Sequence, residues 1–174
     1  MMKVLLLRGV NVGGANRLPM PEFRALLEEL GLTRVETHLQ SGNAVFDDTG
    51  VTDLETRLAT AMRQRFGFAP AQLTLDAKTH AAIVAACPYK AEGIADPTSV
   101  HIWYLASPAK PDQAALRAVA TTERFTLTDR ALYLHAPGGI GRSALVDRLD
   151  RALGVTCTSR NWRSIQAIAA LLTA

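Results

Sequence analysis

The chain has 174 residues, of which 48% are hydrophobic and 20% charged, a composition that is typical of a globular protein and excludes a disordered one. Its net charge of +3 is small for a protein that tracks nucleic-acid phosphates. No apolar run approaches the roughly 20 residues that cross a bilayer, and Met1 to Arg8 hold too few apolar residues for a signal-peptide core. Cys87 and Cys157 lack CxxC spacing, so we expect reduced thiols in a cytoplasmic protein with no membrane partner.

The first half of the chain, residues 3–87, has the pattern strand, helix, strand, strand, helix, strand, helix. The unbroken apolar run from Val4 to Leu7 predicts a central strand that is covered on both faces. A capping box, Thr52-x-x-Glu55, predicts the start of the second helix, and Gly67 its end. The other expected elements are a helix over 21–30, strands over 34–40, 44–47 and 72–75, and a helix over 77–87.

The second half, residues 100–172, repeats this pattern. Strands are expected over 100–105, 125–127, 131–135 and 155–158, and helices over 112–120, from the cap Ser143 to the stop Gly154, and from Trp162 to Leu172. This order is ferredoxin-like. The predicted fold class is therefore α+β, a tandem duplication of a ferredoxin-like βαββαβ unit, each with an added C-terminal helix. We expect subdomains at residues 1–88 and 100–174, joined by a connector at 89–99, because the stretch from Pro88 to Pro97 contains Gly93, two prolines and mixed charge.

One loop breaks the symmetry of the two halves. The first strand-helix connection runs over residues 9–19, whereas its counterpart covers only 106–111. Connections of this type usually have about 2–6 residues, and longer ones are often functional. A glycine-rich loop ahead of a helix is able to present N–H groups to an anion, although this loop matches neither GxGxxG nor a Walker sequence. The candidate ligand-binding residues here are Arg8, Asn11, Gly13, Gly14, Asn16 and Arg17.

Three further segments carry candidate residues, each with a structural alternative. The loop from Pro137 precedes a helix and contributes Gly138, Gly139, Gly141, Arg142 and Ser143, but a tight turn with a serine cap explains it equally well. The segment Arg160, Asn161 and Trp162 meets the last helix, where capping and core packing are the simpler roles. The segment Ser41, Gly42 and Asn43 is most simply a hairpin turn.

The ferredoxin-like topology predicts how these segments group. Residues 8–17 and 41–43 should lie at one end of the first sheet. The glycine loop and Arg160 should share one end of the second sheet, about 10 Å apart, because their strands flank one central strand. We expect the subdomains to pack so that these ends form one cleft lined by arginine, asparagine and glycine.

The candidate segments contain no aspartate, glutamate, cysteine or histidine. A general base or a hard-metal site would normally need one of these, so no metal and no cofactor is expected. The nearest histidines are His38 and His135, although a lone strand histidine is more often structural.

The segments LLRGVNVGGANRLPM, LQSGNAVF, YLHAPGGIGRS and TSRNWRSI, in this order, resemble the bacterial family catalogued as domain of unknown function 1697. The resemblance extends from Lys3 to about Leu172. It implies a cytoplasmic, single-chain protein with two ferredoxin-like subdomains and no established biochemistry. The recurrent segments of the family coincide with the loops identified above.

Three functions follow as hypotheses. The first is binding of a phosphate-bearing or other anionic ligand, such as a nucleotide, with arginines neutralising charge, asparagines fixing orientation and Trp162 stacking a base. Nucleic acid is the weaker version, because the sheets lack the exposed aromatic pairs of an RNA-recognition domain. The alternatives are a group-transfer enzyme with His38 or His135 as base, and a structural or protein-interaction module without a ligand. The sequence sets no oligomeric state.

Overall fold

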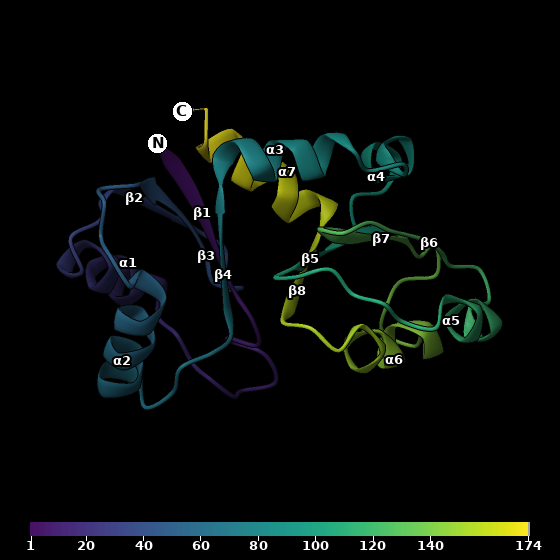
Figure 1. Ribbon diagram of the computed structural model, residues 1–174, viewed down its shortest axis with the longest axis horizontal. Helices are drawn as coiled ribbons and strands as arrows, with labels where there is room; N and C mark the ends of the chain where they lie inside the picture. The colour runs from purple at the N-terminus through teal and green to yellow at the C-terminus, as the bar shows by residue number, and fades with distance from the viewer. Residues whose placement is uncertain (174) are drawn as a thin grey trace. The chain divides into compact units, whose positions relative to one another are not determined.

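The computed structural model describes residues 1–173 and contains two four-stranded antiparallel sheets flanked by helices (Figure 1). The chain divides into two compact units. Unit 1 contains Met1–Ala82 and the residues from Ala167 on, and unit 2 contains Ile83–Gln166. The two sheets have strand orders β2-β3-β1-β4 and β6-β7-β5-β8, which are the same order within each unit. This match confirms the predicted α+β fold with duplicated ferredoxin-like units.

Unit 1 is built on the central strand β1. Its elements are β1 (Met2–Leu7), α1 (Met20–Glu29), β2 (Thr33–His38), β3 (Asn43–Asp47), α2 (Leu54–Phe66), β4 (Gln72–Asp76) and the start of α3 (Ala77–Ala85). Strand β1 pairs with β3 on one side and β4 on the other. Its residues Val4 to Leu7 are at most 1% exposed, so the predicted burial on both faces is confirmed.

Helices α1 and α2 lie together on one face of the first sheet (Figure 1). Alternate residues of β1 point to this face, because successive side chains of a strand point in opposite directions. Leu5 and Leu7 pack there in one core with Phe23 and Leu27 of α1 and Leu58 of α2. This core sets the position of the loop that joins β1 to α1.

The predicted capping box at Thr52 is wrong. Helix α2 begins at Leu54, and the residue before it, Asp53, has φ 53° and makes no capping hydrogen bond through its side chain. A capping box requires an extended N-cap residue, and the left-handed backbone of Asp53 does not meet that requirement. The predicted stop at Gly67 is confirmed, since this glycine has φ 81° and its N–H bonds the Arg63 carbonyl.

Unit 2 repeats the arrangement and adds a helix in front. After the rest of α3 come α4 (Lys90–Ala95), β5 (Val100–Leu105), α5 (Gln113–Val119), β6 (Arg124–Leu127), β7 (Ala131–His135), α6 (Ala144–Leu153), β8 (Cys157–Asn161) and most of α7 (Trp162–Leu171). Helices α5 and α6 lie together on one face of the second sheet (Figure 1). Helix α4 falls in the segment 89–99, which the sequence pattern presented only as a connector. The predicted cap Ser143 and stop Gly154 are confirmed.

The last strand lies further along the chain than predicted. Strand β8 pairs with β5 from Cys157↔Leu105 to Asn161↔His101, whereas the sequence pattern placed a strand over 155–158. The pairing therefore includes Arg160, opposite Ile102, which moves this arginine from a loop into the sheet. Among the described residues, no helix is long and apolar enough to cross a membrane.

Candidate functional site

The loop between β1 and α1 is a small β-hairpin. The Asn11 N–H bonds the Asn16 carbonyl at 3.0 Å, and the Ala15 N–H bonds the Val12 carbonyl at 3.0 Å. The two residues between them, Gly13 and Gly14, have φ 58° and 77°. Positive φ at both central residues defines a type I′ turn, for which Gly-Gly is a favoured pair. The geometry of the hairpin turn is thus sufficient to explain the two glycines that the sequence pattern presented as part of an anion-binding loop.

Two asparagine side chains hold this hairpin in place. The Asn11 amide donates to the carbonyls of Leu18 (2.9 Å) and Gln40 (2.7 Å), and its oxygen accepts from the Leu18 N–H (2.7 Å). The Asn16 amide donates to the Gly9 carbonyl at 3.0 Å. The bond to Gln40 joins the hairpin to the turn between β2 and β3, which confirms that residues 8–17 and 41–43 lie at the same end of the sheet.

The turn between β2 and β3 is itself tightly built. The buried Asn43 amide donates to the His38 carbonyl and the Ser41 hydroxyl, both at 2.9 Å. Gly42 has φ 74°, and a Cβ there would lie 2.8 Å from Leu7 Cβ. Ser41, Gly42 and Asn43 therefore form the turn of the hairpin between β2 and β3, which agrees with the simpler interpretation of this segment.

Charge is unevenly distributed along unit 1. We call residues 8–19, 38–43 and 67–72 the arginine end. The segment 67–72 belongs to it because the Arg8 N–H bonds the Ala71 carbonyl at 2.9 Å. The arginine end contains Arg8, Arg17 and His38 but no aspartate or glutamate.

The opposite end of the same sheet collects carboxylates. Lys3 pairs with Asp76 in the register of β1 and β4, and its Nζ lies 3.3 Å from Asp48 Oδ2 and 3.8 Å from Asp76 Oδ1. Asp47 lies opposite Met2 at this end. The carboxylates of the strands are therefore gathered at the end of the sheet that is remote from the arginine end, while Glu22 lies in the first turn of α1, shortly after residues 8–19.

The surface of the arginine end also exposes apolar side chains. Val12, beside the glycine turn, is 65% exposed, and Leu39 is 46% exposed. Leu39 has φ 60°. A left-handed backbone costs a non-glycine residue about 1–2 kcal/mol, and a leucine that is 46% exposed recovers only part of it by burial. Sequence reasoning missed both residues, because their exposure depends on how the two turns meet.

The glycine loop of unit 2 leads to a helix N-terminus that already has a carboxylate. Ser143 Oγ accepts from the Val146 N–H and donates a short hydrogen bond to Glu123 Oε1. The hydrogen bond from Ser143, with further ones from the Thr121 backbone, lowers the pKa of Glu123 to about 2. The Glu123 carboxylate thus places a negative charge of the protein itself beside the N-terminus of α6. Sequence reasoning missed Glu123, which lies 20 residues from Ser143.

The other candidate residues of this loop make no such contacts. Gly138, Gly139 and Gly141 have open space where a Cβ would stand, and Arg142 is exposed. The loop follows β7, and β7 and β8 flank β5. The register places His135 opposite Val100 and Asn161 opposite His101, so the loop and the end of β8 share one end of the second sheet, as predicted.

The residues at the end of β8 serve the fold. Arg160 is 6% exposed and donates to the Thr158 hydroxyl and the Ser159 carbonyl, both at 2.8 Å. Burial lowers the pKa of Arg160 to about 10. The Asn161 oxygen accepts from the Ser164 N–H at 2.9 Å at the start of α7. Trp162 is 4% exposed, so its ring does not offer a face on which a base stacks.

The two candidate bases have different surroundings. His38 ends β2 and is half-buried at the arginine end. His135 Nδ1 lies 3.2 Å from Arg124 Nη2, and the same arginine nitrogen donates to Glu92 Oε1 at 2.6 Å. Because guanidinium only donates, neutral His135 accepts at Nδ1 and carries its proton on Nε2.

The other two histidines are buried in the fold. Burial lowers the pKa of both His80 and His101 to about 4, so both are neutral near pH 7. No group of three or more metal-ligating side chains occurs within residues 1–173. The cleft expected between the two subdomains stays a prediction.

Comparison with known proteins identifies the family of this chain and a solved structure with a similar fold. A family model described as "Protein of unknown function (DUF1697)" matches residues 1–133. The conserved bacterial protein SP0830 from Streptococcus pneumoniae has a solved structure that aligns with a TM-score of 0.71 and 24% sequence identity, covering 98% of each chain. This likeness shows a shared fold over both units. No curated protein matches.

Proposed function

Because the chain belongs to the DUF1697 family of proteins of unknown function, we propose a function from its own side chains: unit 1 binds a phosphate-bearing, nucleotide-like ligand at the arginine end. The observation that carries this proposal is the separation of charge along the first sheet. Arg8 and Arg17 lie in segments that contain no aspartate or glutamate, and Asp47, Asp48 and Asp76 are gathered at the other end of the sheet. Guanidinium is the side-chain group best matched to phosphate, because its planar fork donates two parallel hydrogen bonds.

The local structure favours binding because the surface is formed before a ligand arrives. The Asn11 bonds to Leu18 and Gln40 tie the hairpin to the neighbouring turn, so little backbone needs to be ordered on binding. Within residues 1–173, the N–H groups of Gly13 and Gly14 donate no hydrogen bond and remain open to an anion.

The exposed apolar residues fit the rest of such a ligand. Val12 and Leu39 offer apolar surface beside the cationic groups. A nucleotide combines a phosphate chain with a flat base, and contact of the base with apolar side chains would bury surface that is now exposed to water. This role also explains why Leu39 is exposed in a left-handed backbone.

The experiment is a calorimetric titration of the whole chain with ATP, ADP and inorganic triphosphate at low salt. We expect saturable binding of the nucleotides and weaker binding of triphosphate. Arg17→Gln should weaken nucleotide binding about 10-fold or more, since a charged hydrogen bond contributes about 1.5–3 kcal/mol. Arg17 is exposed and has no ion pair within residues 1–173, so the substitution should not affect folding.

The matched control is Lys78→Gln, which removes one exposed positive charge two residues beyond Asp76, at the carboxylate end of the sheet. This variant should bind as the parent does. The proposal is refuted if none of the nucleotides binds, or if the two variants lose the same affinity.

A further inference from the structure

Each unit has a groove between the two helices that cover its sheet. The groove between α1 and α2 has a volume of about 410 Å³, and the groove between α5 and α6 about 570 Å³. The first is lined by Leu26, Glu29, Leu30, Ala61, Gln64 and Arg65. The second is lined by Asp112, Ala115, Leu116, Arg148, Arg151 and Ala152.

The two grooves occupy equivalent places in the duplicated fold. Helices α2 and α6 both end at a left-handed glycine, Gly67 and Gly154. Counted back from these glycines, α6 has Arg148, Arg151 and Ala152 at the positions where α2 has Ala61, Gln64 and Arg65.

The partner helices correspond in the same way. Counted from Pro21 and Pro111, Leu116 of α5 stands at the position of Leu26, and Val119 at the position of Glu29. The two grooves therefore differ in the side chains that occupy equivalent positions of their helices.

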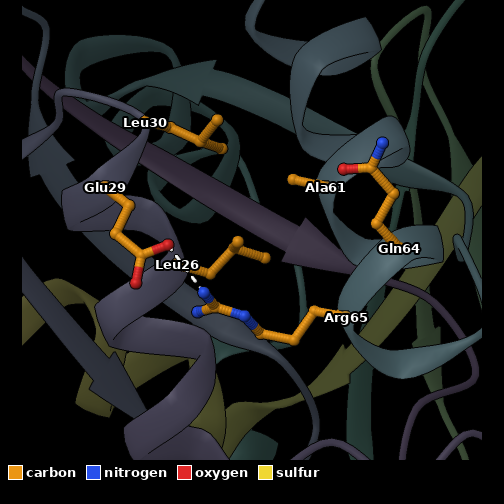
Figure 2. Close-up of a pocket in the computed structure, with 6 residues that line it drawn as sticks. All are labelled: Leu26, Glu29, Leu30, Ala61, Gln64 and Arg65. Carbon is orange, nitrogen blue, oxygen red and sulfur yellow. Dashed lines mark hydrogen bonds and ion pairs between the residues drawn. The ribbon is translucent and has the colours of Figure 1, made fainter.

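In unit 1 an ion pair crosses the groove. Arg65 Nη2 lies 2.7 Å from Glu29 Oε2, and Figure 2 shows the two side chains extending toward each other from opposite helices. The pair neutralises the arginine that lines this groove. An anion therefore finds no uncompensated positive charge among its lining residues.

In unit 2 this ion pair is missing and the groove carries two other cations. Val119 and Ala152 occupy the positions that Glu29 and Arg65 have in unit 1. Arg148 and Arg151 line the groove, and neither has an ion pair among the residues that the structure describes. The one carboxylate in the lining, Asp112, accepts the Ala115 N–H at 3.0 Å as the cap of α5.

We propose that the groove between α5 and α6 binds an organic phosphate monoester with an apolar body. Arg148 and Arg151 are three residues apart on a helix, a spacing that brings Cβ atoms within about 5–6 Å, so both guanidinium groups can reach one phosphate. The two positive charges match a phosphate dianion. Ala115, Leu116 and Ala152 provide apolar surface for the rest of the molecule. A volume of about 570 Å³ is in the usual range of small-molecule sites.

The test uses octyl phosphate as the probe, titrated into the whole chain by calorimetry, with inorganic phosphate and octanol as partial probes. We expect octyl phosphate to bind at least 10-fold more tightly than either partial probe. The variant Arg148→Gln with Arg151→Gln should lose this binding. Equal binding of octyl phosphate by this variant and the parent overturns the proposal.

Two further variants make the result specific. Val119→Glu with Ala152→Arg transfers the ion pair of unit 1 into this groove and should weaken binding while leaving both lining arginines in place. Arg24→Gln with Arg63→Gln removes two exposed charges from the helices of unit 1 and should leave the affinity unchanged. Equal loss of affinity in this control also overturns the proposal. Arg17→Gln should not affect octyl phosphate, so this test is separate from that of the arginine end.

Discussion

Substituting Gly93 by alanine tests whether Trp162 is held by packing. Gly93 lies within α4, where alanine is normally more stable than glycine by about 0.8–1 kcal/mol. In this fold the new Cβ would lie 2.7 Å from Cγ and 2.8 Å from Cδ2 of the Trp162 ring. Those distances are far inside van der Waals contact, and the ring is 4% exposed, so it has little room to move. Overpacking of this kind costs about 1–3 kcal/mol.

The clash should outweigh the gain in helix propensity, and we expect Gly93→Ala to lower the free energy of unfolding by about 1–2 kcal/mol. Urea unfolding followed by tryptophan fluorescence measures this, because both tryptophans, Trp103 and Trp162, belong to unit 2. The control is Gly141→Ala, where a Cβ meets nothing within 4 Å and φ is not positive. It should change the stability by less than about 0.5 kcal/mol. An unchanged or increased stability of Gly93→Ala would refute the assigned packing.

Three other perturbations have defined outcomes. Asn11→Ala removes three hydrogen bonds that hold the hairpin, and urea unfolding should show a loss of about 2–3 kcal/mol in the free energy of unfolding. A loss below about 0.5 kcal/mol would contradict the role of Asn11 in holding the hairpin. Gly14→Ala places a Cβ at φ 77° and should lower the free energy of unfolding by about 1 kcal/mol. An unchanged free energy of unfolding would argue against the type I′ turn. The pKa of His101 falls from 6.5 to about 4 on folding, as does that of His80, so the unfolded chain binds more protons between these values and stability should fall as pH drops from 6.5 to 4, with His101 contributing at most about 3 kcal/mol of the fall. His101→Gln should flatten that part of the pH profile, and an unaltered profile would show that His101 is not buried in its neutral form.

Local patterns were sufficient to predict the architecture. The apolar run from Val4 to Leu7 indicated the central strand, because a strand that is buried on both faces is typically apolar at every position. Gly67 and Gly154 marked helix ends, because a left-handed residue after the last turn favours glycine. The same patterns in both halves then indicated the duplication.

Boundaries that depend on distant contacts were not predictable in this way. Strand β8 extends through Thr158, Ser159 and Arg160, and a polar run of this kind lacks the alternation that marks a strand. Pairing with β5, more than 50 residues earlier in the chain, decides its length. The capping box at Thr52 failed because the sequence motif does not reveal the left-handed backbone of Asp53, φ 53°, at the start of α2.

Topology predicted which segments of unit 1 lie together, but not the contacts that those segments make. The segments around Gly13 and Gly42 meet at one end of the sheet, as topology required. Glycine patterns alone do not separate a type I′ turn from an anion cradle, because both need positive φ. Contacts such as that between Asn11 and Gln40 span 29 residues and only the folded chain reveals them.

The central claim is that the arginine end of unit 1 binds a nucleotide-like anion, and amide NMR tests it most directly. Titration of the labelled chain with ATP should shift the amide signals of Gly13, Gly14 and Arg17 in a saturable way. Signals of the carboxylate end, such as that of Asp76, should stay in place. The claim is contradicted if ATP shifts no signals, or if the shifts gather on residues outside the arginine end.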